Sequence, residues 1–158
     1  MTPNQFLQMI VRPNVTDFQA HLDDLRFAFN AVASVDALVA HLYSWCKQNA
    51  PAETKGGSED SYYRNHLAHQ SSEFSLLRDI AKANKHVHLT RGCPRVSSAH
   101  QVNRRELGWD EGLWEEVYWD VRQQVVVDVN SGQTRSVNAI VNNALSFLEG
   151  EMKRVGAL

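Results

Sequence analysis

The first information in this sequence is what it lacks. Its 158 residues include two cysteines, Cys46 and Cys93, and neither belongs to a CxxC pair, which excludes a disulfide framework. No apolar run approaches the roughly 20 residues that span a bilayer. Residues 1–14 carry no charged segment followed by a long apolar core, as a secretory signal would. No glycine-rich phosphate loop or Ser-His-Asp pattern is visible, and no cofactor is indicated. These absences predict a cytoplasmic protein with reduced thiols and no membrane partner.

The chain also lacks an excess of positive charge. Lys and Arg number 16 and Asp and Glu 18, and the net charge of −2 argues against a uniformly basic nucleic-acid surface. A local excess does occur at residues 82–105, and an acidic block follows at 110–116. This asymmetry is compatible with attraction of a phosphate-bearing partner or with two ordinary solvated faces. The basic residues are Lys82, Lys85, Arg91, Arg95, Arg104 and Arg105.

What the chain does contain is typical of one globular domain. Apolar residues make up 43% and charged residues 22% of the sequence, with no internal repeat. A chain of this length buries about two-thirds of its unfolded surface on folding. We therefore predict a single domain over 1–158, composed of an N-terminal arm (1–15), a helical hairpin (16–85), a small β-sheet (86–137) and a C-terminal helix (138–155).

Apolar periodicity predicts the helical hairpin. Apolar side chains recur at three- and four-residue steps from Phe18 to Trp45, which predicts one helix over about 16–48. A loop with Pro51 and two adjacent glycines follows, and a second helix is expected over about 60–85. The two helices are expected to pack antiparallel to each other.

The N-terminal arm is predicted from its prolines. Pro3 and Pro13 are expected to interrupt any long helix in residues 1–15, because proline lacks a backbone N–H and fixes its own φ.

The pattern after His86 changes to short runs of β-branched and aromatic residues. Asn130-Ser131-Gly132 reads as a turn, and Ser136 or Asn138 as the cap of a last helix that ends at Gly156. The fold class is therefore α+β: a helical bundle with a small antiparallel sheet inserted before the last helix. The expected strands lie at 87–90, 96–102, 115–121, 123–129 and 134–137.

The densest set of chemically active side chains lies in residues 61–91, which hold four of the seven histidines. Within it, Arg64-Asn65-x-x-x-His69 resembles the active-site motif of the HEPN superfamily of helical domains, common in toxins and anti-phage defence systems. The resemblance implies metal-independent RNA cleavage, with Arg64, Asn65 and His69 as catalytic residues. Arginine would hold the scissile phosphate by two hydrogen bonds, and histidine would transfer protons near neutral pH. Without such a site, Arg64 and His69 would be ordinary surface residues of a helix.

A second resemblance covers residues 77–86 and continues into the predicted C-terminal hairpin and helix. The sequence LRDIAKANKH resembles an Asp-x-Ala-Asn-x-x-Lys-His signature of small uncharacterised bacterial proteins, although Lys82 stands where asparagine is expected. This likeness implies a shared fold and no known activity. The residues assigned to substrate binding are Asp79, Lys85, His86 and Arg91. Alternatively, Lys85 and His86 only complement the dipole at the end of a helix.

A metal site is the alternative chemistry for the same stretch. His66, His69 and Glu73 would share one line of a continuous helix and could bind a metal ion together. The sequence lacks a stronger pattern such as His-Glu-x-x-His, so the primary prediction is no metal.

Two functions from different classes follow. The first is a HEPN-like RNase, or an RNase-derived module that binds nucleic acid, which would act as a toxin or defence component. The second is a non-catalytic helical domain that dimerises or binds a partner protein. HEPN-type sites need two chains, so a homodimer is expected for the first. Convergence of Arg64 and His69 in one cleft would favour the RNase, and their separation would favour the interaction domain.

Overall fold

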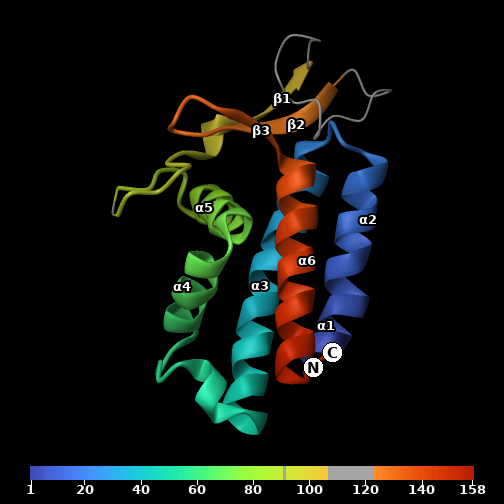
Figure 1. The fold of residues 1–158 in the computed structure, drawn as a ribbon. Coiled ribbons are helices and arrows are strands. Elements are labelled where there is room, and N and C mark those ends of the chain that lie inside the picture. The colour runs from blue at the N-terminus through green and yellow to red at the C-terminus, as the bar shows by residue number, and fades with distance from the viewer. Residues whose placement is uncertain (91, 107–122) are drawn as a thin grey trace.

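Helix α3 (Leu25–Asn49) forms the centre of the fold in the computed structural model, which describes residues 1–90, 92–106 and 123–158. The Asp24 side chain caps this helix by accepting a hydrogen bond from the backbone N–H of Arg26 at 2.8 Å. Its apolar positions are buried against the other helices, among them Val32, Leu38 and Leu42. By length and composition α3 could cross a bilayer, but in this fold it is the central core helix (Figure 1).

The N-terminal segment is helical and packed, so the predicted arm over residues 1–15 is wrong. Helix α1 (Pro3–Phe6), a π-helical turn (Leu7–Val11, η1) and α2 (Arg12–Ala20) follow one another without a break. Pro3 lies in the first turn of α1, where its missing N–H is not needed. The wider π turn, in which the N–H of Arg12 bonds to the carbonyl of Leu7, brings Pro13 into the first turn of α2. The prolines are therefore accommodated at helix starts.

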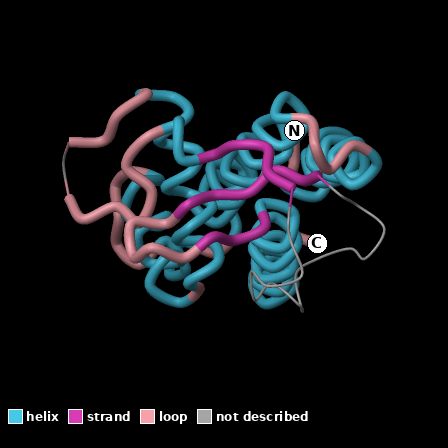
Figure 2. The backbone as a smooth tube through the Cα atoms, turned by 90° about the horizontal axis from the view of Figure 1, so that it is seen from above, coloured by secondary structure: helices cyan, strands magenta, loops and turns pink. Residues whose placement is uncertain are grey.

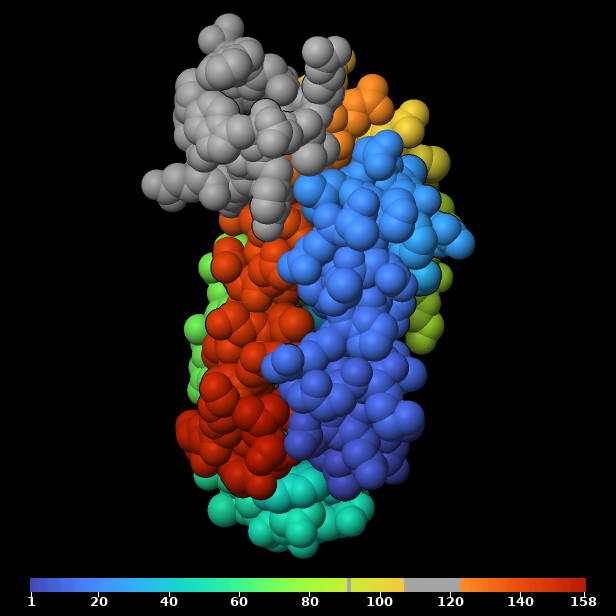
Figure 3. Space-filling view, turned by 90° about the vertical axis from the view of Figure 1, so that its right-hand side faces the viewer, coloured from blue at the N-terminus to red at the C-terminus, as the bar shows by residue number. Residues whose placement is uncertain are grey.

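This N-terminal helix contributes to the core and lies along the last helix. Leu7, Val11 and Phe18 are fully buried. The space-filling view shows the N-terminal helix, in blue, beside α6 (Val137–Val155), in orange to red (Figure 3). Contacts such as the 3.1 Å ion pair between Arg12 and Glu149 join the two.

The predicted helix over 16–48 is two helices, because the chain breaks between Ala20 and Leu25. The reason is a contact with the sheet: the carbonyl of Leu22 accepts a hydrogen bond from the N–H of Val125 at 2.7 Å. An α-helix would have used that carbonyl internally. The break also changes the phase of the apolar stripe, and Leu25 is consequently 39% exposed.

The second predicted helix, over 60–85, is likewise two: α4 (Asp60–Gln70) and α5 (Ser72–His86). Ser71 between them has extended backbone angles, and its hydroxyl accepts a hydrogen bond from the N–H of Phe74 at 3.1 Å. Helix α5 therefore starts in a new direction and crosses the bundle, where Figure 1 shows it almost end-on. It packs on both α3 and α6.

The sheet covers one end of the bundle (Figure 2). Strands β1 (Val102–Glu106), β2 (Gln123–Asp128) and β3 (Thr134–Ser136) are antiparallel in the order β1-β2-β3. Val102 pairs with Val127, and Val126 with Ser136. The Ser136 side chain then caps α6, and Gly156 ends that helix with a φ of 80°. The α+β class and the sheet before the last helix are confirmed.

Two of the strands predicted for the segment between α5 and β1 are wrong. The expected strands at 87–90 and 96–102 reduce to an isolated bridge between His88 and Ser98, followed by the short 3-10 turn η3 (Ala99–Gln101). The Ser98 hydroxyl and the Gln101 side chain form a capping box, which turns the chain before β1 begins. The predicted strand at 115–121 lies outside the described residues.

Candidate functional site

Arg64, the first predicted catalytic residue, points from α4 into a cluster of carboxylates. Its Nη1 lies 2.7 Å from Oδ1 of Asp36 and donates to the backbone oxygen of Asp36 at 2.8 Å. Its Nε donates to Oδ2 of Asp60 at 3.0 Å. The Arg64 side chain is 15% exposed, so its guanidinium is largely shielded and held by groups of this chain.

The partner of Arg64 on α3 is a half-buried carboxylate. Burial raises the pKa of Asp36, and the charge and hydrogen bonding of Arg64 oppose that rise. Oδ1 of Asp36 meets Arg64 as an ion pair without the alignment of a hydrogen bond. Removing Arg64 would therefore leave an uncompensated charge next to the core.

His69 is not brought to Arg64. It lies five positions later on α4, about 140° around a helix of about 3.6 residues per turn. Its side chain is exposed and makes no hydrogen bond or ring contact within the described part of the chain. The structure thus separates the Arg–His pair of the HEPN-like motif within one chain.

Asn65, the third predicted catalytic residue, pairs with an arginine that the motif does not include. Nη1 of Arg78 on α5 donates to Oδ1 of Asn65 at 2.6 Å. Nε of Arg78 is buried and has no hydrogen-bond partner. Lys82 follows one turn later on α5, and we call Asn65, Arg78 and Lys82 the α4–α5 corner. The sequence signal for this site was the four-residue spacing of Arg78 and Lys82.

Burial and neighbouring charges lower the pKa of both cations in the α4–α5 corner. Burial lowers the pKa of Arg78, and nearby Asp36 opposes that effect. Burial also lowers the pKa of Lys82, and the charge of Arg78 lowers it further. Both groups would gain from a nearby negative charge.

The predicted substrate-binding residues divide into two groups. Oδ2 of Asp79 accepts a hydrogen bond from the backbone N–H of Arg95 at 2.8 Å, and Nη1 of Arg95 donates to the carbonyl of Ser72 at 3.0 Å. These contacts fix the segment after α5, so Asp79 has a structural role here. Lys85 and His86 are exposed at the end of α5 and have no side-chain partner in the described ranges. Arg91 lies outside the described residues.

The alternative metal site is not formed. Ser71 interrupts the helix that was to align His66, His69 and Glu73. Glu73 instead pairs with Arg135 at 3.2 Å. Within residues 1–90, 92–106 and 123–158, no three His, Cys, Asp or Glu side chains gather as metal ligands.

Helix α5 ends in an unusual turn between two histidines. Val87 has φ 64° and ψ −50°, and the N–H of His88 bonds to the carbonyl of His86 at 2.7 Å, which is a γ-turn with positive φ. This conformation is costly for a β-branched residue. The turn leads the chain to His88, whose ring centroid lies 6.2 Å from that of His100 on η3. Three imidazoles and two lysines thus belong to the end of α5 and the segment after it.

A second polar cluster lies where α3, α4 and α6 meet, and we call it the Glu151 cluster. The Tyr63 hydroxyl donates to Glu151 at 3.3 Å. Arg154 donates to both carboxylate oxygens of Glu151, at 2.8 and 2.7 Å, and to Glu53 at 2.6 Å. Buried Cys46 adjoins it, and burial raises the pKa of its thiol. The hydrogen bonds in this cluster are internal, so it is structural.

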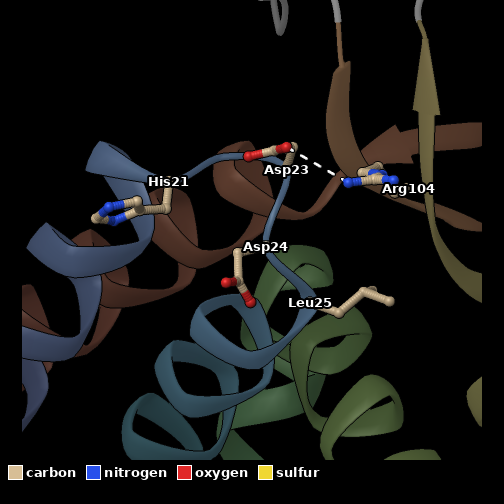
Figure 4. Close-up of a pocket in the computed structure, with 5 residues that line it drawn as sticks. All are labelled: His21, Asp23, Asp24, Leu25 and Arg104. Carbon is tan, nitrogen blue, oxygen red and sulfur yellow. Dashed lines mark ion pairs between the residues drawn. The ribbon is translucent and has the colours of Figure 1, made fainter.

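A surface hollow of about 570 Å³ lies beside the sheet, lined by His21, Asp23, Asp24, Leu25 and Arg104 (Figure 4). Its polar groups are already used: Asp23 pairs with Arg104 at 3.6 Å, and Asp24 caps α3. His21 contacts the backbone oxygen of Asp17 at 2.9 Å and stacks on Phe27. The cations of the α4–α5 corner form no ion pair with the residues that the structure describes, so the corner is the better candidate site.

Comparison with known proteins adds no assignment to this geometry. No family model matches the sequence, and neither a curated protein nor a solved structure is significantly similar to it.

Proposed function

We propose that this protein is a helical module that binds single-stranded RNA through its phosphates, without cleaving it at Arg64 and His69. One observation carries the proposal: residues 80–105 contain no Asp or Glu, while they hold the six basic residues of the 82–105 region and the histidines His86, His88 and His100. A basic segment that carries no carboxylates of its own attracts phosphate groups and releases their counterions on binding.

The charges at the end of α5 are available to a ligand. Lys82 and Lys85 are exposed, and neither forms an ion pair in the part of the chain that the structure describes. Arg104 and Arg105 are less available, because they pair with Asp23 at 3.6 Å and with Asp128 at 3.0 Å. We therefore assign the binding surface to the C-terminal half of α5 and the segment that follows.

Binding is favoured over cleavage by the state of Arg64. The HEPN-like resemblance supports RNA as the partner, but an arginine that clamps a scissile phosphate needs its guanidinium edge free. Arg64 has Nη1 on Asp36 and Nε on Asp60, so one nitrogen of each edge is already occupied. An RNase-derived module that retains the partner and has lost the chemistry fits these contacts.

Fluorescence anisotropy with labelled single-stranded RNA tests the proposal. Lys82→Glu with Lys85→Glu should weaken binding at least about tenfold and reduce the slope of log affinity against log salt by about 1.4, two phosphates at about 0.7 each. The matched control is Lys47→Glu with Lys153→Glu, which changes two exposed lysines of α3 and α6 by the same charge. Equal weakening by both pairs, or no binding by the wild type, would refute the assignment.

The same preparation tests for cleavage. RNA incubated in EDTA should remain intact with the wild-type protein. Cleavage that leaves cyclic phosphate ends and disappears in His69→Ala would instead establish the HEPN-like RNase, since loss of a proton-transfer group costs a factor of about 10²–10⁴.

The homodimer stays a prediction, as does binding of a partner protein. Sedimentation at micromolar concentration measures the first directly. A dimer that binds no RNA would favour the interaction domain over the RNA-binding module.

A further inference from the structure

We propose that Arg78, Lys82 and Asn65 form a specific phosphate-binding site at the α4–α5 corner, which rests on the proposed RNA-binding function and locates one phosphate contact of it. The same chemistry could come from inorganic phosphate or from a phosphodiester of the RNA backbone, and the experiment below separates them.

The hydrogen bonding of Arg78 is incomplete. Nη1 is fixed by Asn65 at 2.6 Å, whereas Nε is buried without a partner. Nη2 makes no hydrogen bond within the ranges that the structure describes, and no carboxylate there lies within ion-pair distance of this guanidinium. Buried donors in folded proteins are nearly always satisfied, so a guanidinium with incomplete hydrogen bonding gains from an additional acceptor. A guanidinium N–H donates a charge-assisted hydrogen bond to a phosphate oxygen. Because Nε is covered, Nη2 is the donor that Arg78 offers to a phosphate oxygen while Nη1 stays on Asn65.

The surrounding charges favour an anion at this position. Lys82 lies one turn after Arg78 on the same helix, which brings two positive groups to one face. The neighbouring carboxylates are already engaged: Asp36 and Asp60 by Arg64, and Asp79 by the backbone of Arg95. A bound phosphate would supply the negative charge that burial makes favourable for both cations and that the charge of Arg78 makes favourable for Lys82.

Asn65 completes the site. Its Oδ1 accepts from Arg78 and so sets the position of the guanidinium. Its Nδ2 has no partner among the described residues and can donate to an anion. Three kinds of donor, a guanidinium, an ammonium and an amide, then converge on one tetrahedral group, which can offer an oxygen to each.

Isothermal titration with sodium phosphate, against sodium chloride of equal ionic strength, tests the site. Asn65→Asp is the sharpest variant, because it keeps the acceptor for Arg78 and the side-chain size while giving the guanidinium a carboxylate of its own. Wild-type protein should bind phosphate, and Asn65→Asp should bind at least about tenfold more weakly. Asn30→Asp, an exposed residue of α3 with the same charge change, should bind like the wild type.

A second variant keeps the test decisive if one protein fails to fold. Arg78→Gln removes the guanidinium and should also abolish phosphate binding, with folding checked by circular dichroism. Equal phosphate binding by wild type, Asn65→Asp and Arg78→Gln would overturn the site, as would absence of phosphate binding by the wild type.

Single-stranded RNA as the second ligand separates this inference from the proposed function. If RNA binds wild type and Asn65→Asp equally, the corner is not a contact for the RNA backbone and this inference is wrong, while RNA binding stands. If phosphate binding depends on Asn65 while RNA does not bind, the site is correct as a small-phosphate site and the RNA function is wrong. Weakening of both ligands by Asn65→Asp supports both.

Discussion

The Glu151 cluster and the α4–α5 corner both contain an arginine, but the two arginines differ in whether they are paired with carboxylates. In the first, Arg154 meets Glu151 at 2.7 Å and Glu53 at 2.6 Å. In the second, Arg78 bonds to the neutral amide of Asn65 and to no carboxylate among the described residues. A cation that forms ion pairs with carboxylates of the same chain stabilises the fold. A cation whose partner is neutral retains its attraction for an external anion. Residue type alone therefore does not distinguish a structural from a binding arginine.

Burial explains why the Glu151 cluster must be closed. Tyr63 is fully buried and Glu151 is 7% exposed. Hydrogen bonding to Arg154 lowers the pKa of Glu151, and burial raises the pKa of Tyr63. A charge at such a position is tolerated because it is paired and hydrogen-bonded.

The largest loss of stability is expected from breaking the hydrogen bonds of the Glu151 cluster. Glu151→Ala removes the acceptor of the buried Tyr63 hydroxyl and one carboxylate partner of Arg154. We expect a loss of about 3 kcal/mol in the free energy of unfolding, which is typical of breaking a buried polar pair. Urea unfolding followed by circular dichroism measures it.

Glu149→Ala is the control for that change, because it lies two positions away on α6 and breaks the more exposed pair with Arg12. A cost below about 1 kcal/mol is expected there. Equal costs for the two variants would mean that the Glu151 cluster is no more structural than the surface.

The next largest loss of stability is expected from replacing Arg64. Like Arg154 in the Glu151 cluster, Arg64 is paired with carboxylates of this chain. Arg64→Met leaves Asp36 as an uncompensated, half-buried carboxylate. Because Asp36 retains some exposure, we expect a loss of about 2 kcal/mol, below the range for a fully buried pair. If this variant is as stable as the wild type in urea, Arg64 is not structural and its assignment to catalysis regains support.

Much of the fold could be predicted where local signals agree with tertiary contacts. The last helix was placed almost to the residue, because Ser136 caps it and Gly156 ends it with positive φ. The β2–β3 hairpin followed from its valine run and the turn before Thr134. The break before Leu25 could not be predicted, because it depends on a hydrogen bond from Val125 in a distant strand.

The candidate site was harder to predict, for a related reason. The spacing of Arg64 and His69 is visible in the sequence, but the carboxylate of Asp36 that occupies Arg64 comes from another helix. The break at Ser71 had a local signal, a hydroxyl three residues before Phe74, but the apolar pattern continued across it. Arg78 was present in the same histidine-rich stretch, and only the packing of α5 on α4 shows that it meets Asn65.

A smaller effect is expected from acid, which protonates the carboxylates of the closed cluster. Hydrogen bonds from Arg154 and Lys55 lower the pKa of Glu53 from 4.5 to about 2. A lowered pKa stabilises the fold above the unfolded value, and this contribution is lost as the pH falls through the folded value. The free energy of unfolding should therefore decrease between about pH 5 and pH 2.

Glu53→Gln isolates that contribution. Asp36 has the opposite effect on the pH dependence, because its pKa is raised in the folded protein. Its stabilising contribution is present below pH 3.8, the ordinary pKa of aspartate, and is lost as the pH rises through the pKa of the folded state. The difference between wild type and Glu53→Gln cancels the Asp36 part, and it should shrink as the pH falls. A difference that is constant from pH 6 to pH 2 would contradict the pairing of Glu53 with Arg154.

The smallest change in stability is expected from replacing Arg78 in the α4–α5 corner. Its comparison with Arg64→Met tests most directly whether Arg78 is a binding or a structural arginine. Arg78→Met removes a half-buried guanidinium that forms no ion pair within residues 1–90, 92–106 and 123–158 and whose pKa is lowered by burial. The change loses one hydrogen bond to Asn65 and the attraction of Asp36, but it relieves the desolvation of Nε and the repulsion of Lys82. These terms oppose each other, so the free energy of unfolding should stay within about 0.5 kcal/mol of the wild type. Urea unfolding beside Arg64→Met makes the contrast: a cost for Arg78→Met as large as for Arg64→Met would show that the corner is a structural cluster and remove the reason for an anion there.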